Sequence, residues 1–202
     1  MRQVFERVLT QLITETERVV MSSCHTPVIV AIDGNCGSGK TTYSDRLATF
    51  FSAAVIHCDD FFLPKQLRTA ERLGEVGGNI HYERLRALLS VIRNEQLPVT
   101  SRQRRTAPIA YRAYNCSQGI YEDRLLHKSN VVIVEGSYAL HPFCAEFYDL
   151  KFLLEIDAQT QLERLTKREG EQGVKNFIDK WIPLENRYFA SLDTSDCIVI
   201  KQ

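Results

Sequence analysis

The chain has 202 residues, of which 44% are hydrophobic and 25% are charged, a composition typical of one globular domain that buries its own core. Its 25 Lys and Arg residues equal its 25 Asp and Glu residues, and a zero net charge argues against binding to nucleic acid, which rests on neutralising many phosphates. Six cysteines without a C-x-x-C pair argue against a zinc site. No apolar run approaches the roughly 20 residues of a membrane-spanning helix, so we expect no membrane partner. We expect a cytoplasmic protein whose thiols are reduced.

Apolar residues at helical spacing predict an amphipathic helix over residues 1–24 that packs on the domain. Five short runs rich in Val, Ile and Leu are typical of parallel strands buried on both faces, and they lie at 28–32, 54–58, 131–134, 152–156 and 197–200. Helical patterns fall between them at 41–51, 82–94, 160–169 and 175–188, and Pro183 should break or kink the last of these. The alternation predicts a single three-layer α/β domain over residues 1–202, with right-handed crossovers.

Two long stretches, 61–78 and 97–119, lack a clean period in their apolar residues. Long irregular segments in a compact domain are commonly lids or binding loops. We therefore expect residues 61–119, which include the helix between these stretches, to form the binding region for a substrate.

The most specific motif follows the first predicted strand and fits G-x-x-x-x-G-K-[ST]. A strand precedes it and a helix begins within it, which is the arrangement that this phosphate-binding loop (P-loop) requires. Glycines let the backbone amides turn toward phosphate oxygens, and the positive end of the helix dipole adds to their attraction. Lys40 should reach the β- and γ-phosphates of ATP, and the Thr41 hydroxyl should bind Mg²⁺. The predicted nucleotide-binding residues are Gly34, Asn35, Cys36, Gly37, Ser38, Gly39, Lys40, Thr41 and Thr42.

Acidic residues after the second and third predicted strands supply further parts of a kinase site. Asp59 and Asp60 follow the second strand, at the edge of the sheet where ligands bind in open α/β folds. A carboxylate there can accept the proton of an attacking hydroxyl, so Asp59 is predicted to be the catalytic base and Asp60 the alternative, unless the pair merely caps a helix. Glu135 follows the third strand in a Walker-B-like position and is predicted to hold Mg²⁺ together with Thr41 and Asp59.

A basic helix face after the fourth predicted strand predicts a lid over residues 160–172. Arg164 and Arg168 are four residues apart and share this face with Lys167 nearby, so they should cover the γ-phosphate and neutralise developing charge. The alternative is a solvated surface whose cations pair with neighbouring acidic residues.

The chain lacks the Asn-Lys-x-Asp of a guanine site, so a small ATP-dependent kinase fits the motifs better than a GTPase does.

Together these residues resemble the uridine kinase family, which groups with phosphoribulokinase and bacterial pantothenate kinase. The resemblance covers about residues 28–200 and rests on the order of P-loop, Asp59-Asp60-Phe61-Phe62, Glu135-Gly136 and basic lid. It implies a five-stranded parallel sheet in the order 2-3-1-4-5 and a kinase that uses Mg²⁺ and ATP. It also implies that Asp59 is the base, that Glu135 is the acid beside Mg²⁺, and that Arg164 and Arg168 are lid arginines.

The acceptor-binding part of the family pattern is missing. The segment 77–83 lacks the family's second substrate Asp, and Tyr114-Asn115-Cys116 lacks the following His, so the ribose and base contacts do not transfer and the acceptor need not be uridine. A basic run at 102–105 could bind an anionic acceptor or form a solvated edge, and Trp181 is expected in the core. Aromatic rings stack on flat groups and Arg binds anions, and the resulting candidate acceptor contacts are Asp60, His81, Tyr82, Tyr111, Arg112 and Tyr114.

The sequence thus predicts an enzyme that transfers the γ-phosphate of ATP to a hydroxyl of a small molecule, most simply a nucleoside-like one. The alternatives are a nucleotide-binding regulatory protein with little kinase activity, and a kinase for a sugar or a pantothenate-like alcohol. A kinase for nucleic-acid ends is disfavoured by the zero net charge. Assembly into a homo-oligomer stays open.

Overall fold

The computed structural model describes residues 2–94 and 107–202. Five strands form an all-parallel sheet in the order β2-β5-β1-β6-β7. They are β1 (Val28–Gly34), β2 (Ala54–His57), β5 (Val131–Glu135), β6 (Leu150–Glu155) and β7 (Ile198–Lys201). Counted along the chain this order is 2-3-1-4-5, so the expected topology is confirmed. Every residue of β1 and β5 is buried, as expected for central strands covered on both faces.

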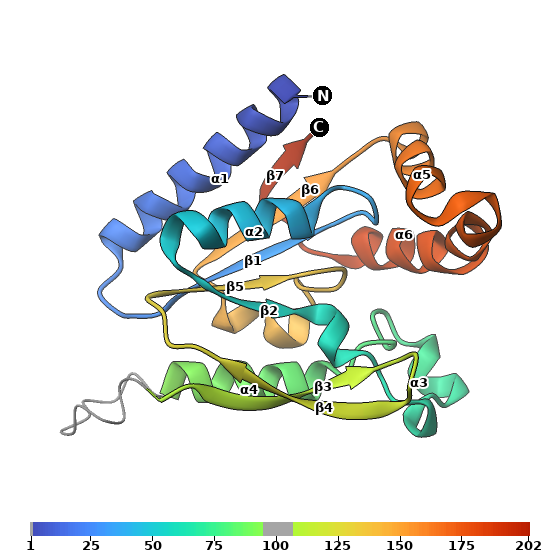
Figure 1. Ribbon diagram of the computed structural model, residues 1–202, viewed down its shortest axis with the longest axis horizontal. Coiled ribbons are helices and arrows are strands. Elements are labelled where there is room, and N and C mark those ends of the chain that lie inside the picture. Colours follow the sequence, from blue (N-terminus) through green and yellow to red (C-terminus); the bar gives the residue numbers. More distant parts are fainter. Residues whose placement is uncertain (1, 95–106) are drawn as a thin grey trace.

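Helices cover both faces of this sheet, which confirms the three-layer α/β architecture (Figure 1). One face carries α1 (Arg2–Ser22) and α2 (Lys40–Phe51), and the other carries α4 (Tyr82–Asn94) and the 3-10 helix η4 (Pro142–Phe147). Each face has its own hydrophobic cluster, in which Leu12 of α1 and Leu89 of α4 are fully buried. The amphipathic N-terminal helix therefore packs on the domain as predicted.

A helical arm follows β6 at the carboxyl edge of the sheet (Figure 1). It consists of α5 (Ala158–Asn176), the π-helical turn η5 (Phe177–Trp181) and α6 (Ile182–Ser191). Asp157 caps α5 by accepting a hydrogen bond from the Thr160 N–H at 2.9 Å. The expected break lies at the π-helical turn, and Pro183 stands in the first turn of α6, where its missing N–H leaves no donor unpaired.

The stretch 97–119, expected to be irregular, instead contains a strand where the structure describes it, while its part at 97–106 lies outside the described residues. β3 (Ile109–Asn115) pairs antiparallel with β4 (Ile120–Leu126). The Asn115 side chain holds the turn by accepting from the N–H groups of Ser117 and Gln118 at 3.1 Å. The prediction failed because the consecutive residues Ala113 and Tyr114 of β3 are both buried, which disturbs the alternation that normally indicates a strand.

The stretch 61–78 also contains local order that the sequence analysis did not resolve. Short helices occur around and within it, namely η1 (Cys58–Phe61), η2 (Lys65–Leu67) and α3 (Ala70–Gly74). Within the described residues, no helix combines the length and the apolar character that crossing a membrane requires.

Candidate active site

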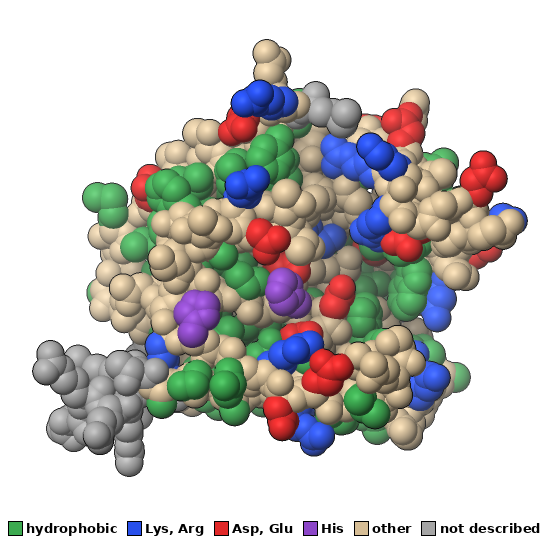
Figure 2. Space-filling view, in the orientation of Figure 1, with side chains coloured by type: hydrophobic (Ala, Val, Ile, Leu, Met, Phe, Trp, Pro, Cys, Tyr) green, Lys and Arg blue, Asp and Glu red, His purple; other side chains and the backbone are tan. Residues whose placement is uncertain are grey.

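A cavity of about 530 Å³ opens where β1, β2 and β5 end, between the P-loop and the helical arm. Figure 2 shows this face hollowed, with basic side chains on the α5 side and acidic side chains along the opposite rim. The lining residues are Cys36, Gly37, Gly39, Lys40, Thr41, Thr42, Asp59, Phe62, Glu135, Gly136, Ser137, Tyr138, Arg164, Arg168, Phe177, Trp181 and Glu185. Carboxyl ends of parallel strands are the usual ligand position in such folds.

The P-loop connects β1 to α2 and forms one wall of the cavity. Gly39 stands at the N-cap of α2 with φ 87°, a left-handed conformation that favours glycine. Lys40 is 9% exposed, and its Nζ donates to the carbonyls of Gly34 and Asn35 at 2.7 and 3.0 Å. A bound phosphate would offer this ammonium a charged and therefore stronger acceptor.

Three of the predicted nucleotide-binding residues, Gly34, Asn35 and Ser38, are not among those that line the cavity. The Asn35 Oδ1 accepts from the Ile156 N–H at 3.3 Å, which ties the loop to the end of β6. Ser38 is fully buried. Backbone amides can still bind phosphate at such positions, because the P-loop works mainly through its main chain.

Asp59 and Asp60 point to different places. Asp59 lines the cavity, and its pKa is raised because burial disfavours its charged form and because the Glu135 carboxylate lies nearby. Asp60 instead accepts a hydrogen bond from the Tyr111 hydroxyl at 2.7 Å. Of the two candidate bases, Asp59 is therefore the one that could meet a molecule in the cavity.

Glu135 lies at the end of β5 beside the first turn of α2. It is 4% exposed, and its Oε2 accepts from the Thr41 hydroxyl at 3.3 Å. In the described part of the chain, no group of three or more His, Cys, Asp or Glu side chains could hold a metal ion by itself. Thr41 and Glu135 nevertheless fit Mg²⁺, because this ion prefers oxygen ligands and usually takes the rest from substrate phosphates and water.

His57, which the sequence analysis did not single out, orients Glu135. Its Nδ1 lies 2.5 Å from the Glu135 Oε1. This hydrogen bond is the main reason why the pKa of His57 is raised. No motif in the sequence indicates this role, because His57 is simply the last residue of β2, followed by the buried Cys58.

The two predicted lid arginines both line the cavity from α5. The Arg164 Nη1 donates to the Gly37 carbonyl at 3.0 Å, so this guanidinium already touches the P-loop. Arg168 is exposed and pairs with Glu169 at 2.6 Å. Lys167 is exposed and is not among the cavity-lining residues.

Glu185 of α6 is a third carboxylate on the cavity wall, beside Asp59 and Glu135, and sequence reasoning missed it. It is 2% exposed, and both of its oxygens accept from the Cys36 N–H, at 3.1 and 3.0 Å. The Cys36 thiol and the Ser137 hydroxyl donate to its Oε1 at 2.7 and 2.8 Å. Burial and this carboxylate raise the pKa of the Cys36 thiol to about 12, so the thiol stays protonated and keeps donating.

Aromatic side chains form another part of the wall. Trp181, expected in the core, instead lines the cavity with its ring centroid 6.3 Å from that of Phe62. The expectation was wrong because the π-helical turn carries Trp181 away from the two core clusters. Tyr138 also lines the cavity with φ 71°, an uncommon conformation for a residue other than glycine. The Asn79 side chain lies beside its buried hydroxyl, although the pair does not reach normal hydrogen-bond geometry.

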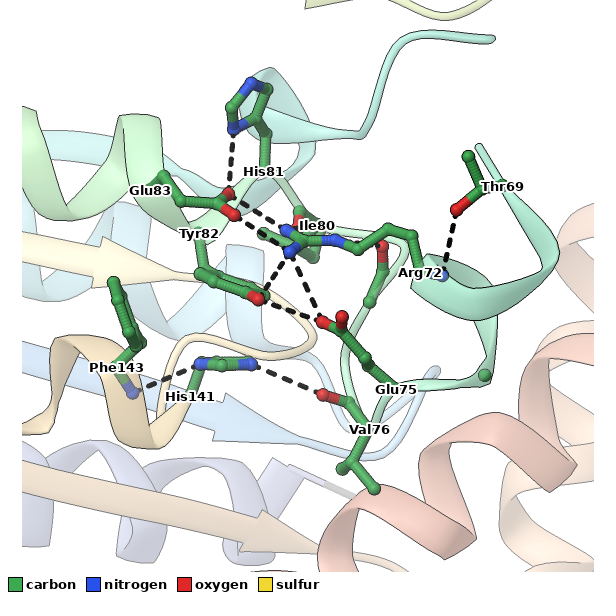
Figure 3. Close-up of polar contacts among 12 residues, drawn as sticks. Thr69, Arg72, Glu75, Val76, Ile80, His81, Tyr82, Glu83, His141 and Phe143 are labelled. Carbon is green, nitrogen blue, oxygen red and sulfur yellow. Dashed lines mark hydrogen bonds and ion pairs between the residues drawn. The ribbon is translucent and has the colours of Figure 1, made fainter. Parts of the chain in front are cut away.

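The predicted acceptor contacts His81 and Tyr82 belong to a separate polar network (Figure 3). The Arg72 guanidinium lies 3.8 Å from the centroid of the Tyr82 ring and pairs with Glu83 at 2.8 Å. Glu83 also contacts the His81 ring at 3.0 Å, and the Tyr82 hydroxyl donates to Glu75 at 2.9 Å. These contacts join the loop around α3 to the start of α4, and neither predicted residue is among those that line the cavity.

The other predicted acceptor contacts lie on or near the β3–β4 hairpin. Tyr111 reaches Asp60, as described above, and stacks on Phe61 with ring centroids 5.8 Å apart. Tyr114 is buried against Tyr121, and Arg112 is exposed. None of these three lines the cavity, and the basic run at 102–105 lies outside the described residues.

The fold and this cavity define a P-loop protein of the α/β class. No protein-family model matches the chain. A possible uridine kinase from Bacillus stearothermophilus has a TM-score of 0.66 and 15% identity, covering 98% of both chains. A proposed fructose transport system kinase from Silicibacter sp. TM1040 has a TM-score of 0.71 and 17% identity, covering 95% of this chain and 98% of that one.

A third similar structure is YFH7 from Saccharomyces cerevisiae, a proposed P-loop kinase with a circular permutation. Its TM-score is 0.71 at 13% identity, and the match covers 96% of this chain and 99% of that one. The chain therefore has the fold of uridine-kinase-like P-loop structures over nearly its whole length, and the expected resemblance is confirmed at the level of the fold.

Proposed function

We propose that this protein is an ATP-dependent kinase that phosphorylates a hydroxyl group of a small molecule. The observation that carries the proposal is that the P-loop, with Lys40, shares one cavity with the Asp59 carboxylate. A protein that only binds nucleotide needs the loop but needs no carboxylate facing an incoming hydroxyl.

Each group has a defined part in this reaction. The amides of the P-loop and Lys40 hold the β- and γ-phosphates, and Arg164 and Arg168 stabilise negative charge on the transferred group. Mg²⁺ bound beside Thr41 and Glu135 would neutralise charge on these phosphates. The acceptor oxygen bonds to the γ-phosphorus, the bond from that phosphorus to the β–γ bridging oxygen breaks, and ADP leaves.

Asp59 accepts the proton that the acceptor hydroxyl loses. Its raised pKa suits this role, because a base whose pKa lies closer to the working pH takes a proton more effectively. Asp59 must be ionised to act, so turnover should fall as the pH is lowered through this raised pKa.

The similar structures support the kinase assignment but leave the acceptor open. One is named for a uridine kinase and another for a fructose transport system kinase, so nucleosides and sugars are both suitable first acceptors to test. Pantothenate adds a third class of alcohol to the panel.

The test is ADP release from Mg-ATP in the presence of each acceptor. Asp59→Asn should lower acceptor-dependent turnover by about 100- to 10,000-fold, the usual range for a general base, while ATP still binds. Asp60→Asn is the matched control, because the Asp60 carboxylate bonds to Tyr111 and is not among the groups that line the cavity. Lys40→Ala should weaken both ATP binding and turnover.

Two results would count against the proposal. Near-normal turnover in Lys40→Ala would contradict the P-loop assignment. ATP binding without stimulation of ADP release by any acceptor would instead favour a regulatory nucleotide-binding protein.

A further inference from the structure

Glu185 brings into the cavity a negative charge that phosphate transfer does not require. Asp59 and Glu135 have roles at the hydroxyl and at Mg²⁺, whereas Glu185 comes from α6, on the helical arm. Its carboxylate contacts Cys36, at the third position of the P-loop motif, and Ser137, two residues after Glu135. It therefore lies between the phosphate-binding wall and the strand end that carries the acidic residues.

Glu185 is held by hydrogen-bond donors that carry no charge. Its partners are an amide N–H, a thiol, a hydroxyl and, at 3.4 Å, the Gln161 amide, all of which donate hydrogen bonds. Such donors replace the contacts that a buried carboxylate would make with water. No Lys, Arg or His in the described ranges forms an ion pair with Glu185 within 4.0 Å, so its charge acts on whatever enters the cavity.

Three cations line the cavity, as far as the described residues go. Lys40 lies on the P-loop, and Arg164 and Arg168 lie on α5. The rest of the wall offers carboxylates and the rings of Phe62 and Trp181. ATP brings its own negative charges to the cations, which leaves none of these cations to bind an anionic acceptor.

We infer that Glu185 is a specificity-determining residue that restricts the acceptor to hydroxyl compounds without a negative charge. This inference rests on the proposed function. Repulsion of this kind is a common way to reject unwanted ligands, because it adds to discrimination without strengthening the correct complex. With an effective dielectric constant of about 20, one unit charge roughly 12 Å away changes affinity about tenfold, and a closer charge changes it more.

The matched variant is Glu185→Gln, which removes the charge and keeps the shape. The amide oxygen of the variant can still accept from the Cys36 N–H and the Ser137 hydroxyl. Its NH₂ group can donate to Gln161, because the Gln161 amide can turn so that its oxygen faces position 185. Glu185→Asp keeps the charge and should keep the discrimination. Glu163→Gln on the exposed face of α5 is the control for loss of a carboxylate elsewhere.

The test compares neutral acceptors with close analogues that carry one carboxylate, namely uridine with orotidine and glucuronamide with glucuronate. Trp181 is the single tryptophan of the chain and lines the cavity, so its fluorescence reports binding to protein loaded with a non-hydrolysable ATP analogue. ADP release from Mg-ATP reports turnover of the same pairs. Wild type should favour the neutral member of at least one pair, and Glu185→Gln should reduce that preference about tenfold when both proteins are saturated with the ATP analogue.

Equal or better binding of the anionic members by wild type would overturn the inference, as would an unchanged preference in Glu185→Gln. Absence of binding by both members of both pairs would overturn it as well. If the preference is found in binding but no acceptor stimulates ADP release, the proposed kinase function fails while the role of Glu185 stands.

Discussion

Replacing Asp33 by Asn should flatten the dependence of folding stability on pH. Asp33 is fully buried at the end of β1, one residue before the P-loop motif begins. Its oxygens accept from the N–H groups of Gly34 and Leu140 at 2.7 and 2.9 Å and from the Tyr188 hydroxyl at 2.7 Å. Burial outweighs these contacts and the nearby Lys40, and it raises the pKa of Asp33 from 3.8 to about 6.

The raised pKa of Asp33 makes the folded protein less stable as the pH rises. A carboxyl group with a higher pKa in the folded state keeps its proton longer than it does in the unfolded chain, so stability falls as pH rises through the window from 3.8 to about 6. Relative to strongly acidic solution, the raised pKa of Asp33 lowers the stability of the fold by about 2 kcal/mol at pH 5 and by about 3 kcal/mol at pH 7. The change between these two pH values is about 1 kcal/mol, roughly fivefold in the equilibrium constant.

The assay is urea unfolding of wild type and Asp33→Asn at several pH values between 5 and 7. The variant loses one hydrogen bond, since Asn offers a single acceptor oxygen, and this loss shifts its stability by a similar amount at every pH. The difference in unfolding free energy between the two proteins should therefore change by about 1 kcal/mol over the range. Parallel curves would show that Asp33 does not titrate in this window and would refute the reasoning.

Three further changes test the neighbouring geometry. Gly34→Ala should destabilise the fold by about 3 kcal/mol or more in urea unfolding, because a Cβ there would lie 2.2 Å from the Leu154 carbonyl oxygen; normal stability would contradict that close approach. With Mg²⁺ on Glu135 as proposed, His57→Ala should raise the Mg²⁺ concentration for half-maximal turnover about tenfold, because loss of a partner that orients a metal-binding carboxylate commonly weakens metal binding by this much. An unchanged Mg²⁺ titration would argue against the role. Tyr138→Phe should change the free energy of unfolding by less than about 1 kcal/mol, because the buried hydroxyl contacts the Asn79 side chain without normal hydrogen-bond geometry, whereas a larger loss of stability would reveal a well-formed hydrogen bond to that group.

The parallel sheet could be predicted from the sequence because its strands are buried on both faces. Continuous Val, Ile and Leu runs mark such strands, and the P-loop fixes which one is central. The β3–β4 hairpin could not be predicted in the same way. Its strands carry charged residues and exposed apolar ones such as Ile120, which is 50% exposed, so neither a continuous run nor a regular alternation marks them.

Sequence reasoning reached the cavity wall where a motif or a strand end locates a residue. Lys40 belongs to the P-loop motif, whereas Asp59 follows β2 and Glu135 ends β5, and the carboxyl ends of parallel strands share one edge. The roles of these residues in catalysis and metal binding stay predictions. Glu185 and Trp181 come from the arm, more than 20 residues beyond β6, and only the packing of that arm brings them to the P-loop. No local motif marks such residues, because their position depends on tertiary contacts.

α6 makes two buried contacts, one to the P-loop and one to the end of β1 just before it. These contacts explain how the helical arm can form part of a precise site. Glu185 and Tyr188 are three residues apart and lie on one face of the helix. Glu185 holds the Cys36 N–H within the P-loop, and Tyr188 donates to Asp33 just before it. Because both contacts are buried and polar, a shift of α6 would leave several donors and acceptors unpaired at once. The position of α6 is thereby tied to the phosphate-binding loop, and Trp181, which directly precedes this helix, is placed on the cavity wall by the same two contacts.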